Sequence, residues 1–411
     1  MLSQKTISIV KSTAPVLEEH GEALTKYFYN RLFTNNPEVK SLFNPANQVS
    51  GAQQKALAGA ICAYAANIDN LDVLGDAVEL IAQKHASLRI EPQDYPIVGT
   101  NLLASIKEVL GEAATEDIIN AWQEAYEFLA QILIAREQQI YIEQKSQTYG
   151  WEGFKKFTVV KKEPESDIVT SFYLSPSDNL NLPLFKPGQY ITVRIPGQEG
   201  YTTMRNYSLS NKPGEKLFRI SVKREDGLNK DSPKGYVSNQ LHNNIHINSI
   251  IEVAPPCGEF FLDITEQHDK PLVLLAAGIG ITPILSMLQT AVETMQNREI
   301  IFIHGILKPE LQPFKKVIDE LAEKHSNLKI HYRYSDIKNP KVLNNDKNSS
   351  VGLIDAELIE SMVTQRNADY YFCGPKIFMM NIYLELMMWG IPASQVHLEF
   401  FGPLQELKKV N

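Results

Sequence analysis

The stretch VLGDAVELIAQKHASLRI, residues 73–90, decides how the N-terminal part of this chain is interpreted. Leu74, Val78 and Ile81 recur at helical spacing, and His85 continues the same apolar stripe. We therefore expect a helix that ends near His85 and turns it toward whatever the stripe faces. A histidine in this position is more often a core residue than a ligand, yet neutral imidazole is the commonest metal ligand on such a face. The rest of the chain has to separate the two interpretations.

Around this stretch, residues 1–146 have helical periodicity and short connections. Ser3 can cap a first helix, which we expect to end with His20 as a C-cap beside Gly21, and a second helix follows to Asn35. Further helices are expected over about 51–67, 73–90, from 92 onward and over 118–136, after a proline-bracketed connection at 37–45. The pattern predicts an all-α N-terminal domain.

Charge and cysteine content limit the partners of the chain. Its net charge is −8, and residues 1–150 hold 11 Lys+Arg against 18 Asp+Glu, so the helical part is acidic. This argues against nucleic acid or an anionic membrane surface as a partner. Cys62, Cys257 and Cys373 are odd in number and far apart, which predicts neither a disulfide framework nor a zinc site. Together with a polar N-terminus that lacks a signal peptide, this favours a cytoplasmic protein.

The texture of the sequence changes over residues 151–264. Six short β-rich runs alternate with turn residues: FTVVKK, DIVTSFYL, GQYITVRI, RNYSLS, LFRISVKRE and SIIEVAPP. Such runs predict a small antiparallel β-barrel, with a helix-like segment at 235–242 between the last two runs.

Residues 270–403 change again, to apolar strands that alternate with amphipathic helices near 310–324 and 376–389. The strands are expected in PLVLLAAG, IIFIHGI, LKIHYRY, DYYFCGP and VHLEFFGP, which predicts an α/β domain with a parallel, nucleotide-binding sheet. The stretch 271–292 has no charged residue. Glycines and a proline interrupt it, so we interpret it as strand, glycine loop and helix and expect no membrane span.

Short motifs give these two domains a resemblance to ferredoxin–NADP reductase-type flavoproteins. The R-x-Y-S motif is Arg205-Asn206-Tyr207-Ser208, with Pro-Gly-Gln-Tyr190 before it and Gly-x-Val237-Ser238 after it. The resemblance implies that Arg205 binds the FAD pyrophosphate, that Tyr207 lies against the flavin ring and that Ser208 hydrogen-bonds the flavin. The helix start near Val237 and Ser238 supplies free amides for phosphate.

The same resemblance covers the nucleotide-binding part. The G-x-G-x-T-P form of the loop is Gly278-Ile279-Gly280-Ile281-Thr282-Pro283, where glycines let the phosphates approach a helix start. By the resemblance, Cys373-Gly374 lies near the nicotinamide, and an aromatic pair within Phe400-Phe401-Gly402-Pro403 covers the flavin. We expect Cys373 to be a small polarizable neighbour of the flavin and not a nucleophile.

The helical domain resembles bacterial globins over nearly all of residues 1–145. By this resemblance His85 is the proximal heme ligand and Phe43 packs on the heme edge, while Tyr29, Gln53 and Leu57 line the distal side. Tyr95 and Glu137 would hydrogen-bond the proximal imidazole and make it a stronger electron donor to iron. Lys84, next to the ligand, is a surface lysine unless it faces the neighbouring domain.

The three domains in this order resemble flavohemoglobins across essentially the whole chain. That family implies heme b, FAD and NAD(P)H as cofactors, a monomer, and conversion of nitric oxide and dioxygen to nitrate, which detoxifies nitric oxide. Two alternatives stay open: a reductase of ferric iron, flavin or hydroperoxides, and an oxygen or nitric oxide sensor or carrier. A preference between NADH and NADPH, and a lipid in the distal heme pocket, also stay open.

Overall fold

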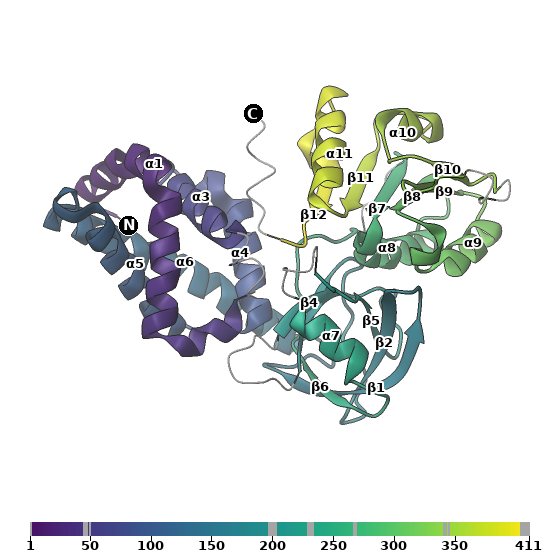
Figure 1. The fold of residues 1–411 in the computed structure, drawn as a ribbon, viewed down its shortest axis with the longest axis horizontal. Helices are drawn as coiled ribbons and strands as arrows, with labels where there is room; N and C mark the ends of the chain where they lie inside the picture. The colour runs from purple at the N-terminus through teal and green to yellow at the C-terminus, as the bar shows by residue number, and fades with distance from the viewer. Residues whose placement is uncertain are drawn as a thin grey trace.

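The computed structural model describes residues 2–43, 48, 51–195, 204–227, 234–265, 269–339, 343 and 346–402. Figure 1 shows three bodies in chain order: a helical bundle, an antiparallel sheet and a parallel sheet flanked by helices. The helical bundle lies beside the antiparallel sheet, and the parallel sheet stands above that sheet in this view. Among the described residues, no helix is both long and apolar enough to cross a membrane.

The first body is the predicted helical domain. Its elements are α1 Gln4–Asn35, η1 Pro37–Leu42, α3 Ala52–Ala66, η2 Leu71–Leu74, α4 Gly75–Leu88, α5 Asp94–Leu110, η3 Gly111–Ala113 and α6 Glu116–Ser146. Two long helices begin at side-chain caps, since Ser3 accepts a hydrogen bond from the backbone of Thr6 and Thr115 accepts one from Ile118. The core between α1, α3, α5 and α6 includes Val10, Leu24, Phe28, Leu32, Ile106 and Trp122.

The helix break expected at Gly21 does not exist. α1 runs without interruption through this position, so the prediction of two helices and of His20 as a C-cap is wrong. A Cβ atom on Gly21 would stand 3.3 Å from the Cβ of Ala58 on α3. Glycine at this position therefore serves the close crossing of two helices and does not terminate one.

The second body is the antiparallel domain, and all six predicted runs form strands. They are β1 Lys155–Pro164, β2 Val169–Pro176, β3 Tyr190–Arg194, β4 Met204–Ser208, β5 Phe218–Lys223 and β6 Ile250–Val253, with α7 Tyr236–Asn243 between the last two. The strand order is β4-β3-β6-β1-β2-β5. The edge strands β4 and β5 approach each other at a bridge between Leu209 and Ile220. The sheet thus curls as a barrel does, although no continuous ladder closes it within the described residues.

The third body is the parallel α/β domain. Its elements are β7 Leu272–Ala277, η4 Gly278–Gly280, α8 Ile281–Thr294, β8 Ile300–Ile306, η5 Pro309–Leu311, α9 Lys315–Lys324, β9 Leu328–Tyr334, β10 Ser349–Val351, α10 Ala356–Met362, β11 Asp369–Cys373, α11 Lys376–Met388, η7 Ala393–Gln395 and β12 Val396–Glu399. The uncharged stretch 271–292 is strand, loop and helix, as predicted. The short β10 and α10 were not predicted, because three and seven residues give little periodicity.

The strand order β10-β9-β8-β7-β11-β12 places a switch point beside β7. The chain leaves β7 toward β8 on one side and later returns to β11 on the other side. Ligands of such sheets bind in the crevice at the carboxyl ends of these strands. Here that crevice is bounded by the loop Gly278–Gly280 after β7 and by Cys373 at the end of β11. A Cβ atom on Gly280 would stand 2.2 Å from the carbonyl oxygen of Cys373, so only glycine fits.

We predict that Gly280→Ala destabilises the α/β domain by about 1–3 kcal/mol, because the new methyl group overlaps backbone atoms that cannot move independently. Thermal unfolding followed by calorimetry measures this change. Gly75→Ala is the matched control, since Gly75 has helical dihedral angles and open space where a Cβ atom would lie. It should be neutral or stabilising by up to about 1 kcal/mol. Equal melting temperatures for the two variants would contradict the steric argument.

Candidate functional site

The helical domain holds His85 through its Nδ1 atom. This nitrogen lies 2.8 Å from Oε1 of Glu137 on α6 and 3.1 Å from the hydroxyl oxygen of Tyr95 on α5. The Tyr95 hydroxyl donates to the same carboxylate oxygen at 2.5 Å. Burial, and next the hydrogen bond to Glu137, raise the pKa of Tyr95, so its hydroxyl keeps the proton that it donates. Three helices thus converge on one imidazole.

These contacts determine the tautomer of His85. Because Tyr95 gives its only proton to Glu137, the Nδ1 atom of His85 has to supply the proton in its own contact with this carboxylate. The Nε2 atom then carries a lone pair. The His85 side chain is 34% exposed, whereas Glu137 is only 2% exposed. A fixed tautomer with an accessible Nε2 is what an imidazole ligand of heme iron requires.

The apolar stripe of α4 also fits a heme. Val78, Ile81 and His85 are only half-buried, whereas Ala82 and Ala86 on the other side of the helix are fully buried. An apolar stripe that is left half-covered inside a domain suits a large, flat and mostly apolar group. The protein side chains around His85 therefore fit the predicted cofactor, and His85 is not a core histidine.

The residues expected on the distal side of the heme come together as well. Tyr29 is 4% exposed, and Gln53 interacts with its hydroxyl, since Gln53 lowers the pKa that burial raises. Its ring meets that of Phe43 edge to face, with centroids 5.6 Å apart. Leu57 is half-buried against the same core. Burial raises the pKa of Tyr29, so its hydroxyl stays protonated at neutral pH and remains a donor.

In the antiparallel domain, the R-x-Y-S motif forms β4. Tyr190 on β3 pairs with Ser208, so the two residues expected to contact flavin are neighbours across the sheet. Burial lowers the pKa of the Arg205 guanidinium, whose Nη1 atom donates to the carbonyl of Met204. Burial raises the pKa of the Tyr207 hydroxyl. Asn206 extends to the other side of the strand and accepts a hydrogen bond from Thr192 at 2.7 Å.

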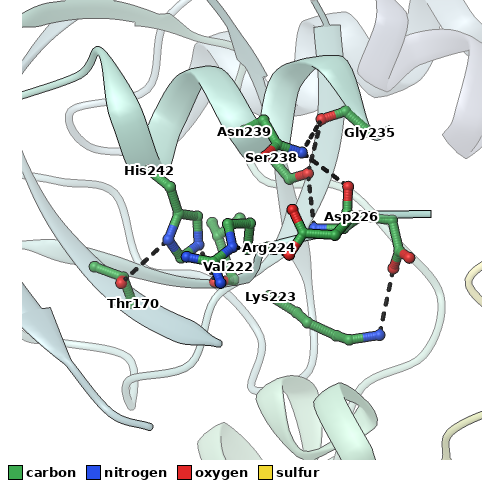
Figure 2. A network of polar contacts seen from close by, with 10 residues as sticks. Thr170, Val222, Lys223, Arg224, Asp226, Gly235, Ser238, Asn239 and His242 are labelled. Carbon is green, nitrogen blue, oxygen red and sulfur yellow. Dashed lines mark hydrogen bonds and ion pairs between the residues drawn. The ribbon is translucent and has the colours of Figure 1, made fainter. Parts of the chain in front are cut away.

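The start of α7 is tied to the loop that precedes it, as Figure 2 shows. The Ser238 hydroxyl donates to the carbonyl of Gly235 and accepts a hydrogen bond from the backbone of Glu225. Val237 is 1% exposed and belongs to the core of the domain. Both side chains are therefore committed to the protein, and their backbone N–H groups are what this helix start can offer a phosphate.

The glycine loop of the α/β domain is hydrogen-bonded by His304, a residue that the sequence did not single out. His304, on β8 next to β7, is fully buried, and its Nε2–H donates to the carbonyl oxygen of Gly278 at 3.0 Å. Burial lowers the pKa of His304 to about 4, so the ring is neutral. Gly278 has a φ of +53°, a conformation that favours glycine. At the other end of η4, Thr282 donates to the carbonyl of Ile279.

Cys373 and Gly374 face this loop across the switch point. A Cβ atom on Gly374 would stand 2.8 Å from the Cβ of Ala277, so the two strand ends are in close contact. Burial raises the pKa of the Cys373 thiol well above its usual range, in accord with a residue that is not a nucleophile. Phe400 is half-buried and Phe401 is exposed. Pro403, predicted in the same segment, lies outside the described residues.

The helix that carries His85 reaches the other two domains. Lys84 is half-buried and its charge interacts with Glu399 at the end of β12; burial raises the pKa of Glu399 to about 7, and Lys84 opposes that rise. Gln83 and Ser87 are buried and contact the antiparallel domain. Lys84 is thus not a plain surface lysine. Gln83 and Ser87 gave no signal in the sequence beyond their position beside His85.

Comparison with known families agrees with this architecture. Residues 26–133 match the globin family, residues 156–262 match the oxidoreductase FAD-binding domain and residues 274–383 match the oxidoreductase NAD-binding domain. Flavohemoproteins are similar over the full length. That of Rhodopirellula baltica is 49% identical over 410 residues, 100% of both chains, and that of Oceanobacillus iheyensis is 46% identical over 100% of this chain and 98% of its own.

The chain belongs to the flavohemoproteins. A solved flavohemoglobin from Malassezia yamatoensis, with bound FAD and heme, has a TM-score of 0.80 and 27% identity, covering 98% of this chain and 100% of its own. The FAD/NAD-binding domain of nitric oxide dioxygenase from Vibrio cholerae covers 61% of this chain and 99% of its own, with a TM-score of 0.53 and 28% identity. The predicted fold class, family and set of heme, FAD and nicotinamide cofactors are confirmed.

If His85 is the heme ligand, as predicted, Glu137→Gln should weaken it as an electron donor, because an amide accepts the Nδ1–H bond more weakly than a carboxylate does. We expect a lower iron–histidine stretching frequency in the resonance Raman spectrum and a loss of about 10–100-fold in heme-dependent activity. Glu143→Gln is the control on the same helix, since Glu143 is 63% exposed and pairs with Arg136. A shift of equal size in both variants would contradict the role of Glu137.

His304 predicts a pH dependence of stability. Its folded pKa of about 4 lies below the unfolded value of about 6.5. As the pH falls from 6.5 to 4, His304 becomes protonated in the unfolded chain but stays neutral in the folded chain. The free energy of unfolding therefore decreases, by roughly 3 kcal/mol in total. His304→Asn should be less stable than the natural protein at pH 7. The difference should shrink toward pH 4 in urea unfolding, and a pH-independent difference would contradict this.

Proposed function

We propose that this flavohemoprotein is an NAD(P)H-dependent nitric oxide dioxygenase, which converts nitric oxide and dioxygen to nitrate. When bound, NAD(P)H supplies a hydride to FAD, FAD passes electrons singly to heme iron, and the heme supplies the site where dioxygen meets nitric oxide. The observation that carries the proposal is the buried pair Tyr95–Glu137 on Nδ1 of His85, in a chain that also has FAD- and NAD-binding domains.

The proximal contacts favour oxygen chemistry over simple oxygen carriage. A carboxylate on the second ring nitrogen increases the basicity of a histidine ligand. An oxygen carrier does not need a more basic ligand, whereas a heme that activates dioxygen benefits from one. Glu137 is almost fully buried, so water does not weaken its hydrogen bond with His85.

The distal residues supply a donor and an apolar wall. The Tyr29 hydroxyl is buried, and burial keeps it protonated, so it can donate to a diatomic substrate. The ring of Phe43 packs edge to face on that of Tyr29, and Leu57 packs against the same apolar core. An isolated donor in apolar surroundings acts more strongly on developing negative charge than one in water does.

The remaining site residues have binding roles in the proposal. Arg205, Tyr207, Ser208, Tyr190 and the amides at Val237 and Ser238 hold FAD, while Gly278 to Pro283, Cys373 and Gly374 hold the nicotinamide nucleotide. Phe400, Phe401 and Gly402 would cover the flavin ring. His304 supports this set by fixing the carbonyl of Gly278 in the turn that approaches the nucleotide phosphates.

We predict that Tyr29→Phe lowers the rate of nitric oxide consumption about tenfold, because one hydrogen bond to the reacting molecule is lost. The measurement is nitric oxide decay in the presence of dioxygen and NADH, followed with an electrode. Tyr27→Phe is the matched control: Tyr27 lies two residues earlier on α1, is 42% exposed and donates to Glu108. It should consume nitric oxide at the natural rate.

The same assay decides between nitric oxide and other acceptors. His85→Ala should abolish nitric oxide consumption, because the iron loses its protein ligand. If the natural protein consumed nitric oxide no faster than His85→Ala, the proposal would fail. If the protein reduced ferric complexes or hydroperoxides faster than it consumed nitric oxide, a reductase of those acceptors would be the better interpretation.

A further inference from the structure

One buried hydroxyl joins the helix of His85 to the strand of the R-x-Y-S motif. Ser87, two residues after His85 on α4, is 1% exposed. Its Oγ atom lies 3.2 Å from the Nδ2 atom of Asn206 on β4, which donates to it. Ser87 also acts on Tyr190 of the neighbouring strand β3, whose pKa is raised by burial and lowered by Ser87. Ser87 therefore contacts the strand of the R-x-Y-S motif directly and lies close to a second residue of the proposed flavin site.

The contacts of this hydroxyl assign each of its hydrogen bonds. Ser87 Oγ donates its proton to the carbonyl oxygen of Lys84, one turn earlier, at 2.8 Å. Its lone pairs are then available to accept from Asn206 on β4. The orientation of the Asn206 amide is fixed by Thr192, whose hydroxyl donates to the Oδ1 atom of Asn206 at 2.7 Å. The Nδ2 atom of Asn206 therefore points toward Ser87. Through Ser87, the backbone carbonyl of Lys84, next to His85, is linked with the side chain of Asn206 on β4.

Neighbouring contacts hold the same boundary between the domains. The backbone N–H of Gly258 donates to Gln83 Oε1 on α4 at 3.2 Å. Gln144, near the end of α6, donates to the carbonyl of Pro256 at 3.2 Å. These contacts keep the helical domain against the antiparallel domain. Ser87 differs from them because its partner Asn206 belongs to the strand of the R-x-Y-S motif, and because Ser87 lies on the same helix turn as His85.

We propose that Ser87 is a positioning residue for electron transfer, which sets the helix of the heme ligand against the strands of the flavin site; this inference rests on the roles proposed above for His85 and residues 205–208. In that step one electron leaves reduced FAD and converts ferric heme to ferrous heme, and no bond forms or breaks. The rate depends on the separation and orientation of donor and acceptor. A misplacement of about 1 Å can change a rate about 100-fold.

The test compares Ser87→Ala with Ser105→Ala in the full-length protein loaded with heme and FAD. Ser105 is fully buried on α5 and donates to the carbonyl of Asn101 at 2.7 Å, so it is the same kind of residue away from the flavin domain. After anaerobic mixing with NADH, Ser87→Ala should reduce its flavin at the natural rate and its heme about 10–100-fold more slowly. Ser105→Ala should reduce both at the natural rates.

A second readout does not depend on turnover. Hydrogen–deuterium exchange should increase in α4 and in β3 and β4 of Ser87→Ala, and should stay unchanged there in Ser105→Ala. If Ser87→Ala fails to fold, Asn206→Ala removes the same hydrogen bond from the more exposed partner and should also slow heme reduction. The double variant should be no slower than the slower single variant.

Two results would overturn the proposal. Heme reduction in Ser87→Ala that equals that of Ser105→Ala would exclude a positioning role, and so would unchanged exchange in β3 and β4. A failure of the proposed function is distinguishable, because it would appear in the natural protein as absent nitric oxide consumption although NADH still reduces its heme.

Discussion

A buried carboxylate on the back of an imidazole is the constraint on which this structure depends. Glu137 is removed from water, and an isolated buried charge is costly. The cost is offset because the carboxylate accepts hydrogen bonds from both Tyr95 and His85. Removing either donor would leave the charge under-satisfied, so α4, α5 and α6 hold one another in place. The stability of the helical domain and the tautomer of His85 are set by the same contacts.

α4 is the element where the three domains meet. One side of this helix presents His85 to the interior of the helical domain, and another side contacts β4 through Ser87. Lys84, between these two sides, interacts with Glu399 at the end of the last strand. A single short helix can serve three neighbours because successive residues point about 100° apart around its axis. The arrangement joins three separate cores through one element, as the proposed transfer of electrons between the domains requires.

The sequence predicted secondary-structure elements and short motifs, whose signals are local or periodic. It did not predict contacts between residues that are far apart in the chain. Alternating β-rich runs located all six strands of the antiparallel sheet, and the glycine loop correctly predicted strand, loop and helix over residues 271–292. Gly21 was misinterpreted as a helix break, since a helix crossing and a helix end require the same residue. Ser87 and Asn206 are 119 positions apart, and no periodicity connects them. His304 was overlooked because a histidine within an apolar strand has no spacing that relates it to Gly278.

The burial of two cysteines has a chemical consequence for a protein whose proposed substrates are reactive gases. Oxidants and nitrosating agents attack the thiolate form of cysteine. Burial raises the pKa of Cys257 to about 12, and it raises the pKa of Cys373 well above its usual range. Both sulfurs therefore remain protonated and shielded from solvent at neutral pH. The FAD-binding and NAD-binding domains can therefore each hold a cysteine without exposing its sulfur to damage.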